Sequence, residues 1–369
     1  MNSKELVILK DDLNNYLNSI KLDDFNYLPA LKGVTKTGKS LSLGFNCYVI
    51  KCLFILNEWN NLDDKIKNDW VNYINSFQIN NENFPQNSYI DENYIKSFNN
   101  FFSGHNLKFQ LKQAMNLLGS NYETKNVYLT NSIRAETKQA ISTLNQINYQ
   151  NKLQYLDFPK DSDEINLFLS NLNWQKPWSA GAQFASLCVF TETQLNNNQN
   201  KLSKDALIKF VDNLVNKEDG FYYLGETPSA QEVVNGTMKI ITGLDWINYD
   251  VHYPEKIIDL CLDFSISSEG CDIVDIVYVL YKCSLTSEYR MHDIDDYFNN
   301  VYIEIMKHYI KEENGFSYFI DKSQVNYYGL KITKGFRTAD IHGTTLLLWA
   351  ISMIENFKKE SNLFQTLKP

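Results

Sequence analysis

His342 carries the side chain with the widest chemical use in this sequence, because an imidazole can act as acid, base or metal ligand near neutral pH. It stands at the start of an apolar run, two residues after Asp340 and close to Arg337. A buried histidine that caps a helix through a backbone carbonyl is the structural alternative. We expect His342 and Asp340 to serve in acid–base catalysis and Arg337 to bind the substrate.

Asp272 and Asp275 form a second pair of candidate catalytic groups. They are three positions apart in a segment made mostly of Ile, Val and Tyr, so at least one carboxylate must face something other than hydrocarbon. Asp272 stands early enough to interact with the helix dipole. Asp275 lies deeper, where an unpaired charge is costly. We predict that Asp275 lines a polar cavity, with a buried structural hydrogen bond as the alternative.

Polar and aromatic residues near the starts of apolar helices are the candidates for substrate binding. Helix starts also offer unpaired N–H groups and the positive end of a dipole to an anion. The substrate-binding set is Trp178, Gln183, Tyr223, Glu232, Asn235, Tyr327, Tyr328 and Arg337. We favour Tyr327 and Tyr328 for stacking on a sugar or an isoprenoid chain, although loop tyrosines also serve to cover a core.

Two kinds of helix must position these residues. The segments 203–215, 254–266 and 293–310 are amphipathic, with charged and polar residues opposite apolar ones. The other segments are apolar nearly all round, which implies burial on every side, and they are 41–56, 134–147, 179–190, 232–246, 270–281 and 339–354. This alternation predicts an all-α fold, an (α/α)6 toroid of concentric inner and outer helices. We expect one domain over 1–369, with an N-terminal helix and extra helical material at about 80–126.

An internal repeat shows which positions on two of the inner helices are equivalent. The segment 218–223, Glu-Asp-Gly-Phe-Tyr-Tyr, recurs at 313–318 as Glu-Asn-Gly-Phe-Ser-Tyr. Each copy leads into an apolar helix, through Asn235-Gly-Thr in one case and His342-Gly-Thr in the other. The second copy holds an insertion with the two tyrosines named above, and insertions on one face of a repeat array are often where ligands bind. The starts of the inner helices therefore mark the mouth where chemistry is expected.

An acidic run at Asp293, Asp295 and Asp296 matches the DxDD motif with which class II terpene cyclases protonate an alkene. Here the run belongs to an amphipathic segment with one wet face, whereas the cyclase acid belongs beside the central hole. We interpret Asp293 as a helix N-cap and the other two acids as first-turn partners of the helix dipole. The run is therefore assigned to structure rather than to catalysis.

Composition excludes some partners. The chain has 369 residues, a formal net charge of −9 and no lysine- or arginine-rich run, so neither nucleic acid nor an anionic membrane is favoured. No apolar stretch is long enough for a signal peptide or a membrane span, and we expect a cytoplasmic protein. The six cysteines lie mostly in apolar runs without a CxxC pair, which favours buried free thiols.

The string GLKITKGFRTADIHGTTLLLWAIS at 329–352 resembles the last inner-helix motif of protein prenyltransferase β-subunits, in the terpenoid cyclase and prenyltransferase toroid superfamily. The resemblance places His342 on a zinc ligand of that family and Asp340 near the motif's acid. The family's Asp-x-Cys ligands find their nearest match in Glu269-Gly-Cys271. The resemblance thus implies a Zn²⁺ site formed by Glu269, Cys271 and His342. The Arg and Lys that hold the lipid diphosphate in the family have no counterpart in 262–268.

These observations predict an enzyme with its active site in the central cavity of the toroid, similar to prenyltransferases or terpenoid cyclases. A carbohydrate-active enzyme on the same fold, such as a glycosidase, lyase or epimerase, is one alternative, because aromatic loops and spaced carboxylates suit sugar processing equally well. A non-catalytic ligand-binding or scaffold protein is the other. The partner expected under either enzymatic hypothesis is a small-molecule or oligosaccharide substrate.

Overall fold

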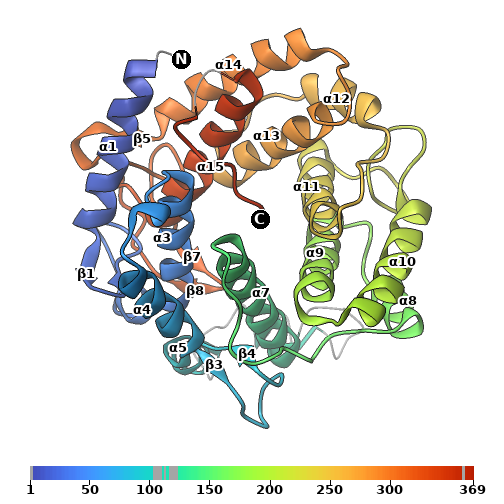
Figure 1. The fold of residues 1–369 in the computed structure, drawn as a ribbon, viewed down its shortest axis with the longest axis horizontal. Helices are drawn as coiled ribbons and strands as arrows, with labels where there is room; N and C mark the ends of the chain where they lie inside the picture. Colours follow the sequence, from blue (N-terminus) through green and yellow to red (C-terminus); the bar gives the residue numbers. More distant parts are fainter. Residues whose placement is uncertain (1–2, 103–109, 112–113, 116–123, 360–361) are drawn as a thin grey trace.

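The inner layer of the molecule is a closed ring of helices (Figure 1). The computed structural model describes residues 3–102, 110–111, 114–115, 124–359 and 362–369. Within these residues the inner helices are α3 (Leu43–Ile55), α7 (Lys125–Gln146), α9 (Pro177–Gln194), α11 (Ala230–Ile247), α13 (Gly270–Ser284) and α15 (Ile341–Lys358). Each packs against the next in this order, and α15 returns to α3. The predicted all-α toroid is therefore confirmed, with each of the six apolar segments on an inner helix.

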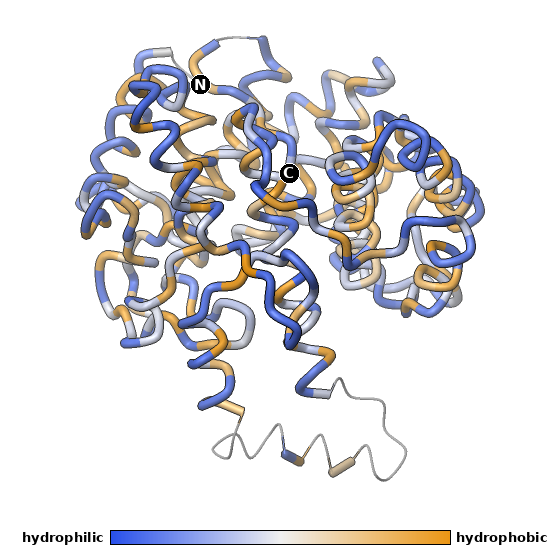
Figure 2. The backbone as a smooth tube through the Cα atoms, turned by 60° about the horizontal axis from the view of Figure 1, so that its bottom comes forward, coloured by the Kyte–Doolittle hydropathy of each residue, from blue (hydrophilic) through white to orange (hydrophobic). Residues whose placement is uncertain are grey.

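Amphipathic helices surround this ring. The outer helices are α1 (Ser3–Ser19), α4 (Asp64–Asn75), α8 (Ser162–Ser170), α10 (Asn197–Leu214), α12 (Pro254–Leu262) and α14 (Met291–Lys307). Two further helices are α2 (Lys36–Ser40) and α5 (Glu92–Phe102), and 3-10 turns lie at Trp59–Asn61 and Lys311–Glu313. Figure 2 shows hydrophilic and hydrophobic residues alternating along the outer helices. These helices bury one apolar face against the ring and leave the other in water.

The strands of the described residues form short hairpins in the loops. They are β1 (Lys21–Asp23) with β2 (Asn26–Tyr27), β3 (Gln78–Ile79) with β4 (Ser88–Tyr89), β5 (Tyr309–Ile310) with β6 (Gly315–Phe316), and β7 (Asn326–Tyr327) with β8 (Leu330–Lys331). Each pair is antiparallel. No strand pattern is strong in the sequence because the strands have only two or three residues each.

The glycines of the internal repeat let neighbouring segments approach the inner helices closely. A Cβ atom on Gly236 would lie 2.5 Å from the Cβ of Pro177, and one on Gly343 would lie 2.3 Å from the backbone nitrogen of Tyr318. Neither distance is compatible with a side chain. Glycine is therefore required for close packing at the start of α11 and of α15, and this explains why it recurs in the repeat.

All inner helices run in the same direction between two mouths of the ring. Near the helix starts, Glu232 of α11 accepts a hydrogen bond from the backbone of Trp178 in α9. Near the helix ends, Lys282 of α13 forms a 2.8 Å ion pair with Asp245 of α11. We call these openings the N-terminal mouth and the C-terminal mouth.

A segment that follows α15, residues 362–369, lies across the C-terminal mouth, and we call it the closing segment. Figure 1 shows residue 369, marked C, near the middle of the ring. The backbone N–H of Gln365 donates to the carbonyl of Ile55 at the end of α3, over 2.8 Å. The indole N–H of Trp246 in α11 donates to the carbonyl of Pro369. The closing segment is thus fastened to helices on opposite sides of the ring.

Several element boundaries differ from the sequence expectations. Helix α7 begins at Lys125 and not at residue 134, and α12 ends at Leu262 and not at 266. Of the extra material expected at about 80–126, the described part holds β4 and α5, and the rest of that stretch falls largely outside the described residues. No helix in the described ranges is both long and apolar enough to cross a membrane.

Candidate active site

Three lysines from three inner helices converge inside the ring. Lys51 belongs to α3, Lys138 to α7 and Lys239 to α11, and each is partly exposed. Helices α3 and α11 stand on different sides of the ring (Figure 1), yet the charge of Lys239 lowers the pKa of Lys51, and both charges lower the pKa of Lys138. The three ammonium groups therefore lie close enough for their charges to interact across the ring. We call this group the inner lysine cluster.

The inner lysine cluster makes the ring interior cationic. Burial lowers the pKa of Lys51 and lowers that of Lys138 well below its ordinary value. Burial is also the largest single influence on Lys239, but the charges of Asp275 and Cys271 together outweigh it, so the pKa of Lys239 is raised. The two atoms Lys239 Nζ and Asp275 Oδ1 are 3.9 Å apart. Three amines thus share few acidic partners, an arrangement that favours an anionic ligand.

His342, the second residue of α15, lies beside this cluster between two tyrosine rings. Its imidazole stacks on Tyr48 of α3 with centroids 4.9 Å apart and on Tyr318 with centroids 5.3 Å apart. Burial lowers the pKa of His342 to about 3, and Lys51 and Lys239 add to the effect. The imidazole is therefore neutral at physiological pH. The His342 side chain remains partly exposed, so a ligand inside the toroid can reach the imidazole.

Two ring-facing groups lack the partners that buried polar atoms normally have. Both carboxylate oxygens of Asp275 and the Nδ1 atom of His342 are buried without a hydrogen-bond partner among the described residues. Asp275 is fully buried, and burial raises its pKa to about 7. Orphaned polar atoms of this kind are rare in folded proteins and call for water or a ligand. Among the described residues, the ion-pair partner of Asp275 is Lys239.

Tyr327 and Glu136 form a buried pair next to the stack. The Tyr327 hydroxyl donates to Glu136 Oε1, and the ring contacts Tyr48 edge-on at 6.5 Å. Burial raises the pKa of Glu136 to about 8, against the lowering effect of the Tyr327 hydrogen bond. A Cβ atom on Gly44 would lie 1.8 Å from the Tyr327 hydroxyl. Tyr327 is therefore part of the wall, whereas Tyr328 is only half-buried.

Asp340 accepts backbone hydrogen bonds at the start of α15. Its Oδ1 accepts the backbone N–H of Gly343 over 2.8 Å, while Oδ2 accepts those of Tyr318 and Gln324 over 2.7 and 3.1 Å. The side chain is 1% exposed, and burial raises its pKa to about 6 in spite of these bonds. Both oxygens are occupied by backbone donors. We therefore assign Asp340 a positioning role for His342 and Tyr318.

Asp272 joins the starts of α11 and α13 at the rim. Its Oδ1 accepts from the side chain of Asn235 over 2.9 Å, and its Oδ2 accepts from Ser267 over 3.0 Å. Gln231 in turn donates to Asn235 over 2.7 Å. Asp272 also lines a cavity of about 400 Å³ with Gln231 and Ser267. The i, i+3 pair is therefore divided, with Asp275 facing the lysines and Asp272 in this rim network.

The other expected substrate-binding residues lie around the rim. Gln183 accepts from Arg134 of α7 over 3.0 Å, and Tyr223 is buried and donates to Asp219. Trp178 and Arg337 are both exposed. The structure records no contact of these residues with His342 or the inner lysine cluster among the parts of the chain that it describes.

Glu269, Cys271 and His342 do not form a metal site in this structure. Across the described ranges, no three His, Cys, Asp or Glu side chains are grouped so that they could hold a metal ion. Glu269 is exposed at the start of α13. Burial raises the pKa of Cys271 to about 12, so its thiol is protonated. The residues present therefore do not fit the implied zinc.

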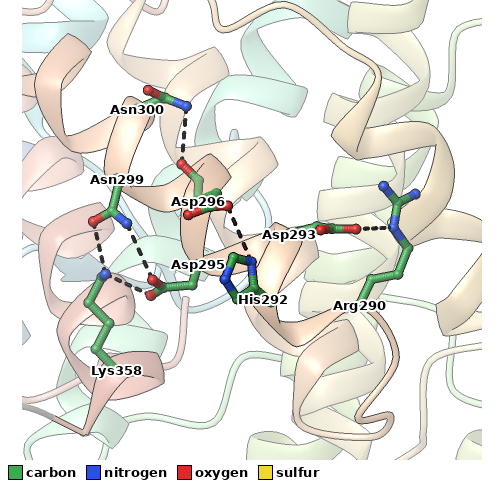
Figure 3. Close-up of polar contacts among 8 residues, drawn as sticks. All are labelled: Arg290, His292, Asp293, Asp295, Asp296, Asn299, Asn300 and Lys358. Carbon is green, nitrogen blue, oxygen red and sulfur yellow. Dashed lines mark hydrogen bonds and ion pairs between the residues drawn. The ribbon is translucent and has the colours of Figure 1, made fainter.

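The acidic run of α14 consists of surface ion pairs (Figure 3). Asp293 binds Arg290 at 2.6 Å, Asp295 binds Lys358 at 2.7 Å, and Asp296 lies 3.2 Å from a ring nitrogen of a histidine one turn earlier. The location on an outer helix agrees with the structural interpretation. One detail is corrected, since the N-cap is Arg290 and Asp293 lies in the first turn.

Sequence reasoning missed the inner lysine cluster and the two tyrosines of the stack. The available signal was a single lysine inside an otherwise apolar helical run, as in Val-Ile-Lys51-Cys and Met-Lys239-Ile. A lysine buried on every side is rare unless it has a partner. Lysines on helices expected to be buried all round are therefore candidates for the interior of the ring.

The raised pKa of Asp275 predicts a pH-dependent effect of its substitution. A pKa that rises from 3.8 to about 7 corresponds to about 4 kcal/mol. The native state holds this proton more tightly than the unfolded state does, so ionisation of Asp275 destabilises the fold between about pH 4 and about pH 7. Asparagine cannot ionise, although Lys239 then loses its carboxylate partner. We expect the unfolding free energy of Asp275→Asn, relative to the native protein, to rise by roughly 3 to 4 kcal/mol across this window.

Urea denaturation at several pH values tests this effect. The matched control is Asp263→Asn, which changes an exposed carboxylate. The stability difference for this control is expected to stay level with pH. A level profile for Asp275→Asn as well would contradict a raised pKa at Asp275.

The sequence matches no protein-family profile and no curated protein. Among solved structures, the chain is similar to a polysaccharide lyase, with a TM-score of 0.48 and 10% sequence identity over 98% of this chain and 99% of that chain. At this identity we base the proposed function on the side chains of this chain alone.

Proposed function

We propose that this protein is an enzyme that acts on an acidic carbohydrate by removing a proton from the carbon next to a carboxylate. This step begins both the elimination catalysed by a lyase and the inversion catalysed by an epimerase. The observation that carries the proposal is the convergence of Lys51, Lys138 and Lys239 beside the neutral imidazole of His342. The cluster supplies positive charge for the anion, and the imidazole accepts the proton.

The lysines serve the chemistry in two ways. Ammonium groups that bind the sugar carboxylate also stabilise the negative charge that develops on it when the neighbouring C–H bond breaks. Because Lys51 and Lys239 lower the pKa of His342, an anion that neutralises them raises that pKa again. His342 thus becomes a stronger base when an acidic substrate is bound.

Glycoside hydrolysis is less well supported, because it needs two carboxyl groups that flank the substrate. Asp340 is saturated by backbone donors, Asp272 is held in the rim network, and Glu232 accepts the Trp178 N–H. Among the described residues, Asp275 lies beside Lys239 with both oxygens free, whereas Glu136 accepts the hydroxyl of Tyr327. One free carboxylate does not supply the pair that a glycosidase requires.

A second candidate function, prenyl transfer or cyclisation, has one observation in its favour. Three ammonium groups can hold a diphosphate as well as a carboxylate. Buried tyrosines such as Tyr48 and Tyr327 would face an isoprenoid chain equally well. A non-catalytic role finds less support, because His342 is not sealed in the core. Farnesyl diphosphate therefore belongs in the substrate test beside the acidic sugars.

The test is an activity screen with matched lysine variants. Polygalacturonate, alginate and hyaluronan are followed by the ultraviolet absorbance of a new C=C bond conjugated to the carboxylate, and by uptake of deuterium from heavy water. A hydrogen bond to a charged group is worth about 1.5–3 kcal/mol, so Lys51→Met and Lys239→Met should each raise KM roughly 10- to 100-fold.

The matched control is Lys209→Met, which replaces an exposed lysine of α10 and should leave KM unchanged. Unchanged KM in both cluster variants would contradict the proposal. So would turnover of farnesyl diphosphate without any reaction on the acidic sugars.

A further inference from the structure

The closing segment is bound to the ends of several inner helices. Besides the contacts with Ile55 and Trp246, the backbone N–H of Lys368 donates to the Gln146 side chain of α7 over 2.6 Å. Asn57, just after α3, donates to the carbonyl of Leu363 over 2.8 Å. These contacts reach α3, α7 and α11, so the segment crosses the C-terminal mouth from one side of the ring to the other.

Apolar packing holds the closing segment in place. Phe364 and Leu367 are 6% and 4% exposed. The Lys368 ammonium lies over the Trp246 ring, 4.9 Å from its centroid. Burial of two large apolar side chains favours the bound position. The closing segment is therefore packed across the C-terminal mouth.

The inner lysine cluster lies a short distance from the closing segment, on the side of the N-terminal mouth. Along α3, Lys51 precedes Ile55 by about one turn, or roughly 6 Å, and along α11, Lys239 precedes Trp246 by about two turns, or roughly 10 Å. His342 and Asp275, in contrast, lie near the starts of their helices. From the N-terminal mouth inward, the order is thus the His342 stack, the lysines and the closing segment.

We infer that the site is a dead end and that the enzyme attacks the terminal sugar of an acidic chain, an inference that rests on the proposed function. A polymer cannot pass through a ring with one closed mouth. The terminal uronate enters first, and its carboxylate binds the inner lysine cluster. The rest of the chain extends out through the N-terminal mouth. Acidic oligosaccharides and the ends of polyuronates are therefore the substrate class.

The reaction at the terminal sugar is an elimination. The C–H bond next to the carboxylate breaks, and the proton goes to the imidazole of His342. The electron pair of that bond forms a C=C bond to the next ring carbon. The C–O bond from that carbon to the rest of the chain breaks, and the leaving oxygen takes up a proton. No oxidant or reductant is required, and each turnover releases one unsaturated sugar.

The test compares product size with viscosity during digestion of the polyuronate that is active in the screen. We expect single unsaturated sugars from the earliest time points, while the viscosity falls slowly. An early fall in viscosity with long fragments means internal cleavage and overturns the inference, although the proposed function then stands. Absence of reaction on every acidic sugar overturns the proposed function itself.

A variant with a loosened closing segment tests the cause. Phe364→Ala combined with Leu367→Ala removes both apolar anchors, and limited proteolysis shows whether the segment is released. A released segment should raise the ratio of long to short early products several-fold. Asn362→Ala, at an exposed position, is the matched control and should keep the native product pattern. A released segment with an unchanged pattern would show that closure does not determine the mode of attack. If the double variant fails to fold, the native digestion decides alone.

Discussion

Replacement of His342 by glutamine is expected to lower kcat by about 1,000-fold while KM changes little, because a positioned general base contributes roughly 100- to 10,000-fold. Glutamine keeps a planar polar group between Tyr48 and Tyr318 but cannot accept a proton at neutral pH. The carboxylate of the substrate still binds the inner lysine cluster. Steady-state kinetics on the acidic sugar identified by the screen provide the measurement.

The His342→Gln result is informative only if the fold is intact. Thermal unfolding of the variant should match that of the native protein within a few degrees, since Nδ1 of His342 has no hydrogen-bond partner among the described residues to lose. Asp295→Asn on the outer helix α14 serves as the activity control and should retain full kcat. A His342→Gln enzyme with more than a third of the native kcat would exclude His342 as the base.

Replacement of Asp340 by alanine is expected to reduce the free energy of unfolding by about 4 kcal/mol. Three backbone N–H groups lose their acceptor in a buried site, and each unsatisfied donor costs about 1–3 kcal/mol. Part of that cost is recovered as the loop relaxes. Urea denaturation at neutral pH gives the value.

Asparagine at position 340 provides the matched control. Its side-chain oxygen can still accept the Gly343 N–H and cap α15, whereas its NH₂ group faces the donors of Tyr318 and Gln324. We expect Asp340→Asn to lose about half as much stability as Asp340→Ala. Equal and small losses, below about 1 kcal/mol for both variants, would contradict the structural role assigned to Asp340.

The ring itself could be predicted because two physical patterns coincide in the sequence. A helix surrounded by other helices needs apolar residues on every side, and an outer helix needs them on one side only. The residues from 270 to 281 show the first pattern, and those from 203 to 215 show the second. The repeat then aligned the starts of α11 and α15, and the structure places both at the N-terminal mouth.

The candidate site could be predicted only in part. His342 and Asp275 are conspicuous because titratable groups are rare in apolar runs, and both lie inside the ring. The lysines gave a weaker signal, because a long side chain can often extend its charged end to water. A helix buried on every side also lacks a wet face that would show which side chains point toward the ring axis.

The function of Asp340 could not be read from its spacing to His342. The sequence shows that a carboxylate precedes the helix, but the three donors come from Gly343, Tyr318 and Gln324, and the loop that brings the last two close has no regular pattern. Loop geometry depends on tertiary packing. The same reason explains why Tyr327 was expected on the substrate and lies bonded to Glu136 in the wall.

The packing of α15 against α3 has a consequence for the order of folding. Cys52 and Thr345, whose side chains are in contact at 3.3 Å, are separated by 293 positions, so the ring cannot close until nearly the whole chain has left the ribosome. Until then α3 and α13 each present an apolar side without a neighbour, and such surfaces promote aggregation of nascent chains. The last inner helix to be synthesised is thus also the one that covers both and brings His342 to the site.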